Sequence, residues 1–480
     1  MSSGFAVDPG VLLGGLLLIV GVVASGLAER FRVPSLLLFL GLGMAVADEG
    51  LGLVRFDDAA LAQNIAAVAL VIILFEGGLG TDPAAFRSCG APSALLATVG
   101  VVITAFVVAG FTALVLGWEF QDALLLGSVI ASTDAAAVFA ALRSSQLPRR
   151  TMRILQLESG MNDPVAVLMT VGMVEVWRGE PDAADWALFL VQQLGGGLVV
   201  GVAIGLSGRR FLDAAAGASS AAVLTLAIAA VSYGIAAVGG ASGFLAVYLT
   251  GVLLARSDRR VRGVLFFHES LASTAQGVLF LLLGILVFPS ELIDDLDVSI
   301  PVAIVLVLVA RPLAVFSVLV WSRTPVARMT VISWAGLRGA VPVVLATIPF
   351  TAGHPSGSAI FDATFVVVLL SVAVQAPTVG PLARRLGVDE PADVRVAAEL
   401  VPVDSLGADV IEISIPEDSR LNGRSLRSAP PPGDARVVLL HRGEQTLVPS
   451  GDTELACGDR LLVVGFRSEQ LADLEHWSGT

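Results

Sequence analysis

Six ionisable side chains lie deep within long apolar stretches of this sequence. They are Glu76, Asp134, Glu158, Asp163, Arg311 and Arg338. A charged side chain at the centre of a membrane costs about 2.5–3.5 kcal/mol, so each of the six needs a structural or functional reason. Carboxylate oxygens bind hard cations and protons, and an arginine can neutralise a carboxylate. We therefore expect an ion-handling site inside a membrane.

Asp134 lies in the middle of one apolar run, directly after the small polar residues Ser132 and Thr133. Such a segment can unwind and offer backbone carbonyls to a cation, which a membrane tolerates only beside a cavity. The residue pattern leaves a second interpretation open, in which a neighbouring serine or arginine satisfies one buried carboxylate.

Asp163 lies in the segment Glu158-Ser159-Gly160-Met161-Asn162-Asp163-Pro164. On a helix, Ser159 and Asp163 share one face and Glu158 and Asn162 share another, because residues four apart are neighbours. Pro164 cannot donate a backbone hydrogen bond, so it frees a carbonyl one turn earlier. Several oxygens therefore converge near Asp163, although a purely structural role for Asn162 and Asp163 also remains open.

The two arginines oppose these carboxylates. Arg311 precedes a proline, and Arg338 lies between Gly336 and Gly339, where a helix would break. Glu158 and one arginine could form a buried ion pair that stabilises the fold without touching a transported ion. We favour this structural role for Glu158 over a role as a ligand.

Two carboxylates that lie close together and away from water repel each other, so they favour binding one positive ion, which can be a proton or a metal cation. A proton and a metal cation then compete for the same oxygens, and a site that can face either side of the membrane would exchange one for the other. Asn162 stands beside Asp163 in place of a second acid. We therefore infer an electroneutral exchange of one monovalent cation for one proton.

The composition predicts a multi-span membrane protein. Of 480 residues, 55% are hydrophobic and 15% are charged, and the mean hydropathy is +0.84. Soluble domains carry about 25% charged residues, so an ordinary soluble enzyme, a disordered protein and a coiled coil are excluded. The net charge of −13 argues against a nucleic-acid partner.

We count thirteen apolar runs as membrane spans. They cover residues 9–28, 34–47, 61–80, 91–116, 119–142, 151–177, 186–208, 219–238, 243–256, 263–288, 299–321, 327–349 and 358–383. Alternate loops carry 17 arginines, whereas the opposite loops carry only Arg55 and Arg178. This asymmetry predicts an N-terminus outside the cell and a C-terminus in the cytoplasm.

Spans five and twelve hold the segments that would break a helix, and they are seven spans apart. An odd offset gives equivalent segments opposite orientations, which is typical of inverted repeats whose broken helices cross at the binding site. The predicted fold is therefore a polytopic α-helical membrane protein with inverted repeats and broken crossing helices, covering residues 1–386.

The last part of the chain has a different pattern. Residues 387–404 are acidic and contain prolines, and we interpret them as a linker. Short β-like runs follow at 410–415, 436–441, 446–449 and 460–466, and then an amphipathic helix at 468–477. Residues 405–480 are thus predicted to form a small cytoplasmic α+β domain.

At the segments around Glu76, Asp134, Glu158–Pro164, Arg311 and Arg338, the chain resembles the NhaP-type sodium or potassium/proton antiporters. The resemblance implies thirteen helices in the membrane of a bacterial cell, a homodimer formed through a scaffold domain, and a mobile core domain that carries the ion.

The same resemblance implies roles for individual residues. Asp134 and Asp163 would be the main cation ligands, Thr133 would contribute its backbone carbonyl, Ser159 its hydroxyl, and Glu76 would act through water. Asn162 would steady the crossing of the broken helices. Glu158 would pair with an arginine, preferably Arg311, with Arg338 close by. No resident cofactor and no catalytic residue is expected.

The tail is similar to the TrkA-C module, through the segments Ile413–Leu426, Val448–Thr453 and Cys457–Gly465. Such modules are dimeric regulators of potassium transport, and some bind small ligands such as cyclic dinucleotides. A dimerisation role without a ligand remains an alternative. An antiporter joined to this tail resembles potassium/proton antiporters, although the ligand set itself does not separate K⁺ from Na⁺.

Two other functions remain as alternatives to a potassium/proton antiporter. One is a Na⁺-selective antiporter, and the other is a passive potassium channel gated by the tail, although no filter sequence typical of potassium channels is present. An intramembrane enzyme lacks a nucleophile–base pair, since His268 is expected at the end of a span, beside Glu269. We therefore predict a transporter and not an enzyme.

Overall fold

The computed structural model describes residues 12, 14–23, 35–54, 59–81, 83–134, 137–138, 147–179, 183–214, 218–255, 259–388, 409–415, 419–433, 435–442, 445–466 and 477. The chain divides into two compact units, Met1–Asp389 and Glu390–Thr480. The predicted linker and the predicted helix at 468–477 lie almost entirely outside the described residues, as does most of span five beyond residue 134.

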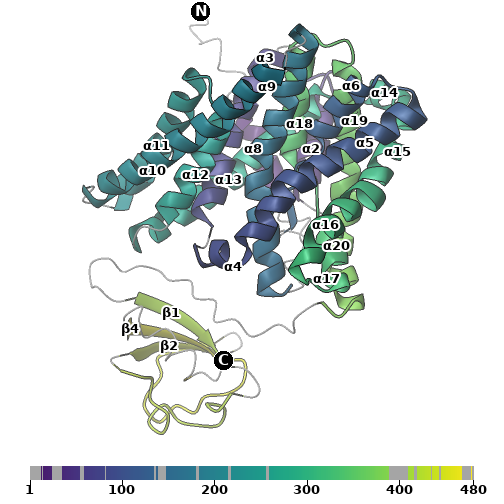
Figure 1. Cartoon of the computed structure of the whole chain (residues 1–480). Coiled ribbons are helices and arrows are strands. Elements are labelled where there is room, and N and C mark those ends of the chain that lie inside the picture. Colours follow the sequence, from purple (N-terminus) through teal and green to yellow (C-terminus); the bar gives the residue numbers. More distant parts are fainter. Residues whose placement is uncertain are drawn as a thin grey trace, which may run out of the picture. The chain divides into compact units, whose positions relative to one another are not determined.

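In its described part, the regular structure of the first unit consists of helices joined by loops (Figure 1). Its helices are α2 (Ser35–Val46), α3 (Ala59–Leu79), α4 (Pro83–Leu95), α5 (Val101–Leu116), α6 (Phe120–Val129), α8 (Arg149–Gly179), α9 (Ala183–Leu190), α10 (Gly196–Ala214), α11 (Ala218–Val238), α12 (Gly243–Ala255), α13 (Arg259–Leu286), α14 (Pro289–Asp294), α15 (Leu296–Val305), α16 (Arg311–Leu319), α17 (Val326–Trp334), α18 (Ala340–Thr351), α19 (Gly357–Leu370) and α20 (Ala376–Arg385). Four π-helical segments join successive helices, at Leu96–Gly100, Val191–Gly195, Leu306–Ala310 and Ser371–Gln375.

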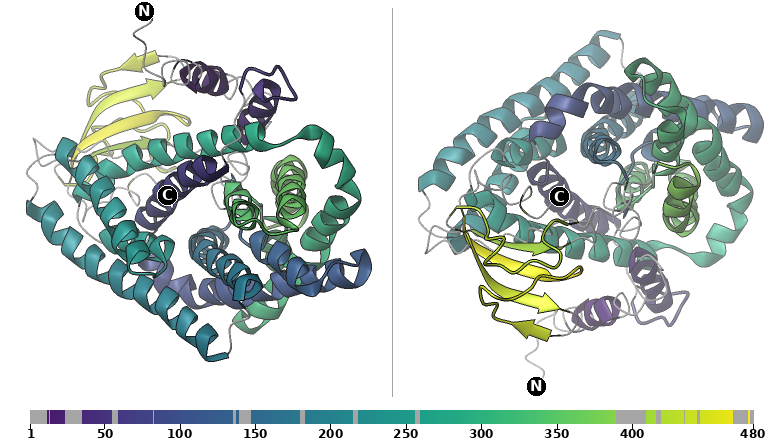
Figure 2. Two further views of the ribbon diagram at one scale, coloured as in Figure 1. Left: turned by 90° about the horizontal axis from the view of Figure 1, so that it is seen from above. Right: turned by 90° about the horizontal axis from the view of Figure 1, so that it is seen from below.

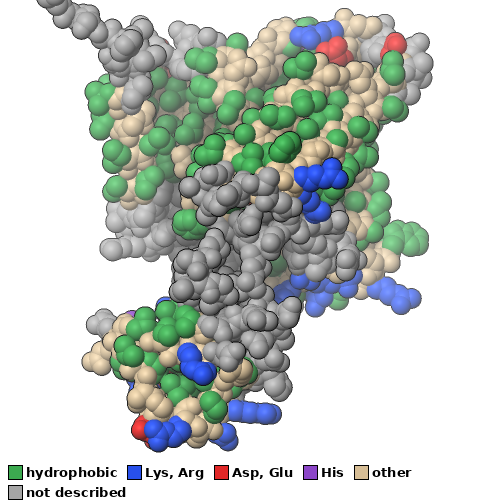
Figure 3. Space-filling view, turned by 90° about the vertical axis from the view of Figure 1, so that its left-hand side faces the viewer, with side chains coloured by type: hydrophobic (Ala, Val, Ile, Leu, Met, Phe, Trp, Pro, Cys, Tyr) green, Lys and Arg blue, Asp and Glu red, His purple; other side chains and the backbone are tan. Residues whose placement is uncertain are grey.

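Within the described residues, seven helices are long and apolar enough to cross a membrane, and five shorter apolar helices accompany them. Figure 3 shows apolar side chains spread over the described part of one face of this unit, interspersed with other side chains and backbone. Helices suit this environment because each satisfies its backbone hydrogen bonds internally. The membrane fold is therefore confirmed, whereas the number of thirteen crossings stays a prediction.

Both predicted helix breaks are present. α6 ends at Val129 and is followed by a non-helical segment up to Asp134. Five residues separate the end of α17 at Trp334 from the start of α18 at Ala340. α8, in contrast, continues without interruption through Pro164. The end-on views in Figure 2 show the green helices α18 and α19 enclosed by other helices of the unit.

The second unit contains a four-stranded antiparallel sheet with the strand order β1-β4-β2-β3. The strands are β1 (Asp409–Ser414), β2 (Arg436–Arg442), β3 (Gln445–Leu447) and β4 (Arg460–Phe466), close to the predicted runs. Ile413, Leu440 and Leu461 belong to its apolar core. Arg442 donates two hydrogen bonds to the buried Asp459, and this contact raises the pKa of Arg442 above its ordinary value.

Candidate ion-binding site

The two interrupted segments meet each other through their backbones. The backbone N–H of Asp134 donates to the carbonyl of Leu337 at 2.8 Å. The side chain of Arg338 donates in turn to the carbonyl of Ser132, also at 2.8 Å. Carbonyls after the end of a helix have no intrahelical donor, and a cation is favourable at that end. Arg338, which is only 1% exposed, therefore stabilises the broken end of α6.

α8 presents two polar side chains to the same broken segment. The hydroxyl of Ser159 donates to the carbonyl of Thr133 at 2.6 Å, and the amide of Asn162 donates to the hydroxyl of Thr133 at 2.7 Å. All three side chains are buried. Because each bond fixes one group of Thr133, α8 determines the course of the unwound chain just before Asp134.

Asp163 follows Asn162 on α8, and its side chain is buried. Within the described residues, its Oδ1 has no hydrogen-bond partner, and neither does Oδ1 of Asn162 or Oγ of Ser132. Asp134 and the hydroxyl of Ser132 are both near enough to interact electrostatically with Asp163, although Ser132 makes no hydrogen bond of good geometry to it. Buried acceptors without donors are costly, and a cation or proton would satisfy them. The residues present therefore fit a bound cation as cargo.

The Asp134 carboxylate is held from two sides. Its Oδ1 accepts the backbone N–H of Ala137 at 3.2 Å, and its Oδ2 accepts the side-chain amide of Gln276 at 2.9 Å. Gly339 lies against the same carboxylate, so closely that a Cβ at this position would collide with it. The glycine next to Arg338 therefore makes room for an acid on the opposite segment.

Glu158 pairs with Arg311, as the resemblance implied. The guanidinium donates to both carboxylate oxygens, at 2.5 Å and 2.9 Å, and both side chains are almost fully buried. Gly336 packs against Arg311 and has no side chain to obstruct it. This bidentate pair joins α8 to α16 and neutralises two of the six intramembrane charges, because opposite buried charges compensate each other.

Glu76 lies on α3 and is half-buried. It interacts electrostatically with Asp134 and with Glu269 on α13. Nearby, the side chain of Gln156 on α8 donates to the carbonyl of Gly80 just after α3, at 3.1 Å. Glu76 thus lies at the edge of the site, where α3 approaches α8.

Two residues at or near the site were not found from the sequence. Gln276 is a half-buried amide inside an apolar run, and the only signal in the sequence was that an amide in such a run needs a hydrogen-bond partner. Tyr248 on α12 packs against Gly160 of α8. Asp362 on α19 is a further buried carboxylate that the sequence did not single out, but its polar neighbours among the described residues are Ser358, at 3.5 Å, and acids on and just after α14, not residues of the site.

His268 lies near the start of its span, as expected. It is fully buried within α13, and its Nε2 is 2.8 Å from the hydroxyl of Thr225 on α11. The ring also contacts Phe75 on α3 edge-on. The apolar span on α13 covers Val264–Leu286, so His268 lies about one turn inside the span, where it is buried among neighbouring helices.

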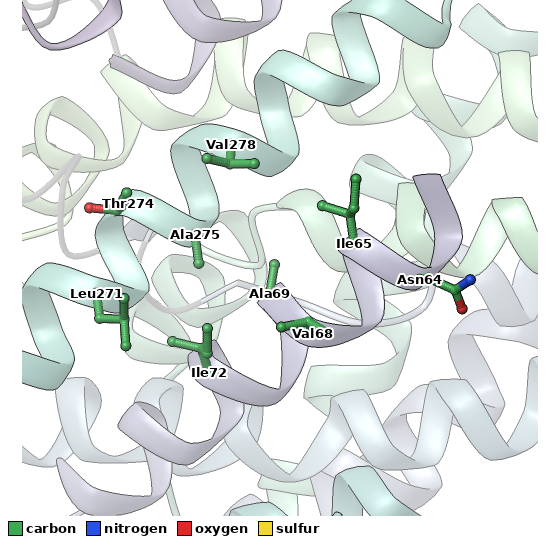
Figure 4. Close-up of a pocket in the computed structure, with 9 residues that line it drawn as sticks. All are labelled: Asn64, Ile65, Val68, Ala69, Ile72, Leu271, Thr274, Ala275 and Val278. Carbon is green, nitrogen blue, oxygen red and sulfur yellow. The ribbon is translucent and has the colours of Figure 1, made fainter. Parts of the chain in front are cut away.

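A cavity of about 420 Å³ lies between α3 and α13 (Figure 4). Residues 64–72 of α3 and 271–278 of α13 line it, and all but Asn64 and Thr274 of the lining side chains are apolar. Such a lining offers no carboxylate to a cation. Among the described residues, no group of three or more His, Cys, Asp or Glu side chains could hold a metal ion.

Interrupted helices that cross inside a membrane unit, with buried carboxylates at the crossing, are typical of secondary transporters. Residues 15–385 match the transmembrane model of the sodium/hydrogen exchangers. The chain belongs to this family, which consists of cation:proton antiporters, and it is therefore a transporter and not an enzyme. Residues 410–477 match the TrkA-C domain. The predicted family and tail module are thus confirmed.

Curated relatives extend over nearly the whole chain. It is 35% identical to the K(+)/H(+) antiporter NhaP of Alkalimonas amylolytica, over 96% of this chain and 81% of the relative. It is 34% identical to the K(+)/H(+) antiporter NhaP2 of Shewanella baltica, over 95% and 80%. It is also 31% identical to the Na(+)/H(+) antiporter NhaP of Pseudomonas aeruginosa, over 67% and 81%.

A solved structure shares the fold. The sodium proton antiporter MjNhaP1 from Methanocaldococcus jannaschii at pH 8 superimposes with a TM-score of 0.71, over 78% of this chain and 97% of the other. The two sequences are 22% identical, so this similarity bears on the fold of the membrane unit.

Proposed function

We propose that this protein is a secondary antiporter that exchanges intracellular K⁺ for external H⁺ at Asp134 and Asp163. The observation that carries the proposal is the unmatched Oδ1 of the buried Asp163 beside a second carboxylate, at the crossing of two interrupted segments. The names of the relatives with the same domain arrangement favour K⁺. The cation and the proton compete for the two carboxylates, and the loaded site faces each side of the membrane in turn.

The exchange is electroneutral, with one cation for one proton. Glu158 and Arg311 compensate each other. Asn162 carries no charge, and Arg338 is engaged with the carbonyl of Ser132. Arg338 keeps its positive charge, because its partner is a neutral carbonyl. Together with Arg338, the two carboxylates leave one net negative charge, which either one proton or one monovalent cation balances.

The surrounding oxygens complete the cation site. Thr133 contributes its carbonyl and Ser159 its hydroxyl. These two groups are hydrogen-bonded to each other, so they are already within reach of one cation. The Ser159 hydroxyl rotates away from Thr133 when both oxygens turn to the ion. Glu76 acts through water from the edge of the site, and Asn162 positions Thr133.

The remaining architecture follows the resemblance. Residues 1–386 form the transport domain, 387–404 a linker and 405–480 a cytoplasmic regulatory domain, with the N-terminus outside the plasma membrane of a bacterial cell. Two copies form a homodimer through the scaffold domain. The tail regulates transport, with a small ligand such as a cyclic dinucleotide as its proposed effector.

Reconstitution into acid-loaded vesicles that contain a pH-sensitive dye tests this function. Adding K⁺ outside should make the lumen more alkaline without generating a membrane potential. Asp163→Asn should abolish the response, whereas Asp362→Asn, which alters a buried carboxylate on α19, serves as the matched control. Absence of a response to both K⁺ and Na⁺, or an unchanged response in Asp163→Asn, would overturn the proposal.

The Na⁺-selective alternative is favoured by one relative, which is named a Na(+)/H(+) antiporter. The same vesicles decide between the two ions. A response to Na⁺ at concentrations where K⁺ produces none would assign the protein to sodium/proton exchange and leave the site residues unchanged.

A further inference from the structure

Gln276 connects α13 to the proposed ion site. α13 packs mainly on α2, α3 and α11. The segment that carries Asp134 is instead bonded to the broken segment around Leu337 and lies beside α8. The hydrogen bond from Gln276 to Asp134 therefore joins two groups of helices that meet at the site, across 142 positions of the sequence.

This hydrogen bond occupies an atom that a cation would need. The amide N–H of Gln276 donates to Oδ2 of Asp134, while the backbone N–H of Ala137 donates to Oδ1. Gly339 closes another side of the carboxylate. An N–H donor and a cation are both the positive partner of a carboxylate oxygen, so they compete for Oδ2. A hydrogen bond to a charged acceptor is about twice as strong as one between neutral groups.

We propose that Gln276 is a positioning residue that latches the unloaded Asp134 to α13. A cation displaces the amide from Oδ2 when it binds, and the displacement frees the site from α13. The unloaded site remains attached, so its movement between the two sides of the membrane is suppressed. This inference rests on the proposed antiport, because an antiporter remains coupled only if its empty site does not cross.

The latch has two measurable consequences. Without the amide, the cation has no competitor at Oδ2, so the half-saturating K⁺ concentration should fall by about tenfold, as expected for the loss of one hydrogen bond to a charged group. In addition, the site should move from one side of the membrane to the other without a bound cation or proton. A K⁺ gradient would then move charge without protons, and a membrane potential would develop.

The test compares wild type with Gln276→Leu and Gln276→Asn in the same vesicles. Leucine removes the donor, and asparagine keeps an amide that is one methylene too short to bridge the present distance. Ser270→Ala is the matched control, because the Ser270 hydroxyl is exposed on the same helix and bonds within it, to the carbonyl of Phe266. A pH dye reports the exchange, and a voltage-sensitive dye reports any potential.

Both Gln276 variants should show a lower half-saturating K⁺ concentration, a maximal rate within about threefold of wild type, and a K⁺-dependent potential. Ser270→Ala should match wild type, which develops no potential. If exchange-competent Gln276 variants keep the wild-type half-saturating concentration and develop no potential, the latch is overturned. A raised half-saturating concentration, or loss of exchange in both correctly inserted variants, would also overturn it, because Gln276 would then be a ligand. If the wild-type protein shows no exchange, the result contradicts the proposed antiport itself and not only the role of Gln276.

Discussion

At the scale of the residue, the site depends on small groups that leave room for charged ones. Gly339 lies against the carboxylate of Asp134, and Gly336 lies against the guanidinium of Arg311. Thr133 offers one group to Ser159 and another to Asn162. The identities of these uncharged residues therefore determine where the charged atoms lie.

Gly339→Ala should abolish most of the exchange. The added Cβ would collide with the Asp134 carboxylate and displace it. A reacting group misplaced by about 1 Å can cost about 100-fold in rate, so we expect a loss of at least about tenfold in the vesicle assay. Gly234→Ala on α11 is the matched control, since no atom lies near its added Cβ. Full activity in Gly339→Ala would contradict the proposed geometry.

At the scale of the element, two kinds of contact hold the broken helices in place. Arg338 from the segment between α17 and α18 binds the end of α6, and Asn162 and Ser159 from α8 bind the same stretch. The Glu158–Arg311 pair then attaches α8 to α16. The backbone groups of the broken segments lack the hydrogen bonds that a continuous helix would make. These side chains replace some of those hydrogen bonds.

Arg311→Leu should destabilise the protein strongly, because it leaves the Glu158 carboxylate buried without its partner. The expected cost is about 3–5 kcal/mol, measured as a lower melting temperature of the purified protein in detergent. The double variant Glu158→Leu/Arg311→Leu should recover most of this loss, since it removes both buried charges. A double variant that is as unstable as the single one would show that the pair does more than compensate charge.

At the scale of the whole molecule, the chain consists of two units with separate cores. The membrane unit belongs to an antiporter family, and the second unit matches a separate domain family. All the residues of the proposed ion site lie in the first unit, and the sheet of the second unit has its own apolar core. Transport and the proposed regulation by the second unit should therefore be separable.

A chain that ends at Val388 should still exchange K⁺ for H⁺. Its half-saturating K⁺ concentration should equal that of the full chain, because every proposed ligand is retained. The maximal rate or its dependence on pH should change, since the proposed regulator is gone. The vesicle assay with both proteins at matched density measures this. A truncated protein that inserts but does not exchange would make the tail a part of the transport machinery.

The sequence by itself determined the buried charges, the two helix breaks and the four strands of the tail. These features are local, because hydropathy, glycine and proline positions and two-residue alternation act over short stretches of chain. Only the tertiary structure decided which arginine pairs with Glu158 and which residue reaches Asp134. Arg311 is 153 positions from Glu158, and Gln276 is 142 positions from Asp134. Such contacts depend on how helices pack, and several polar residues in different spans satisfy the same local pattern.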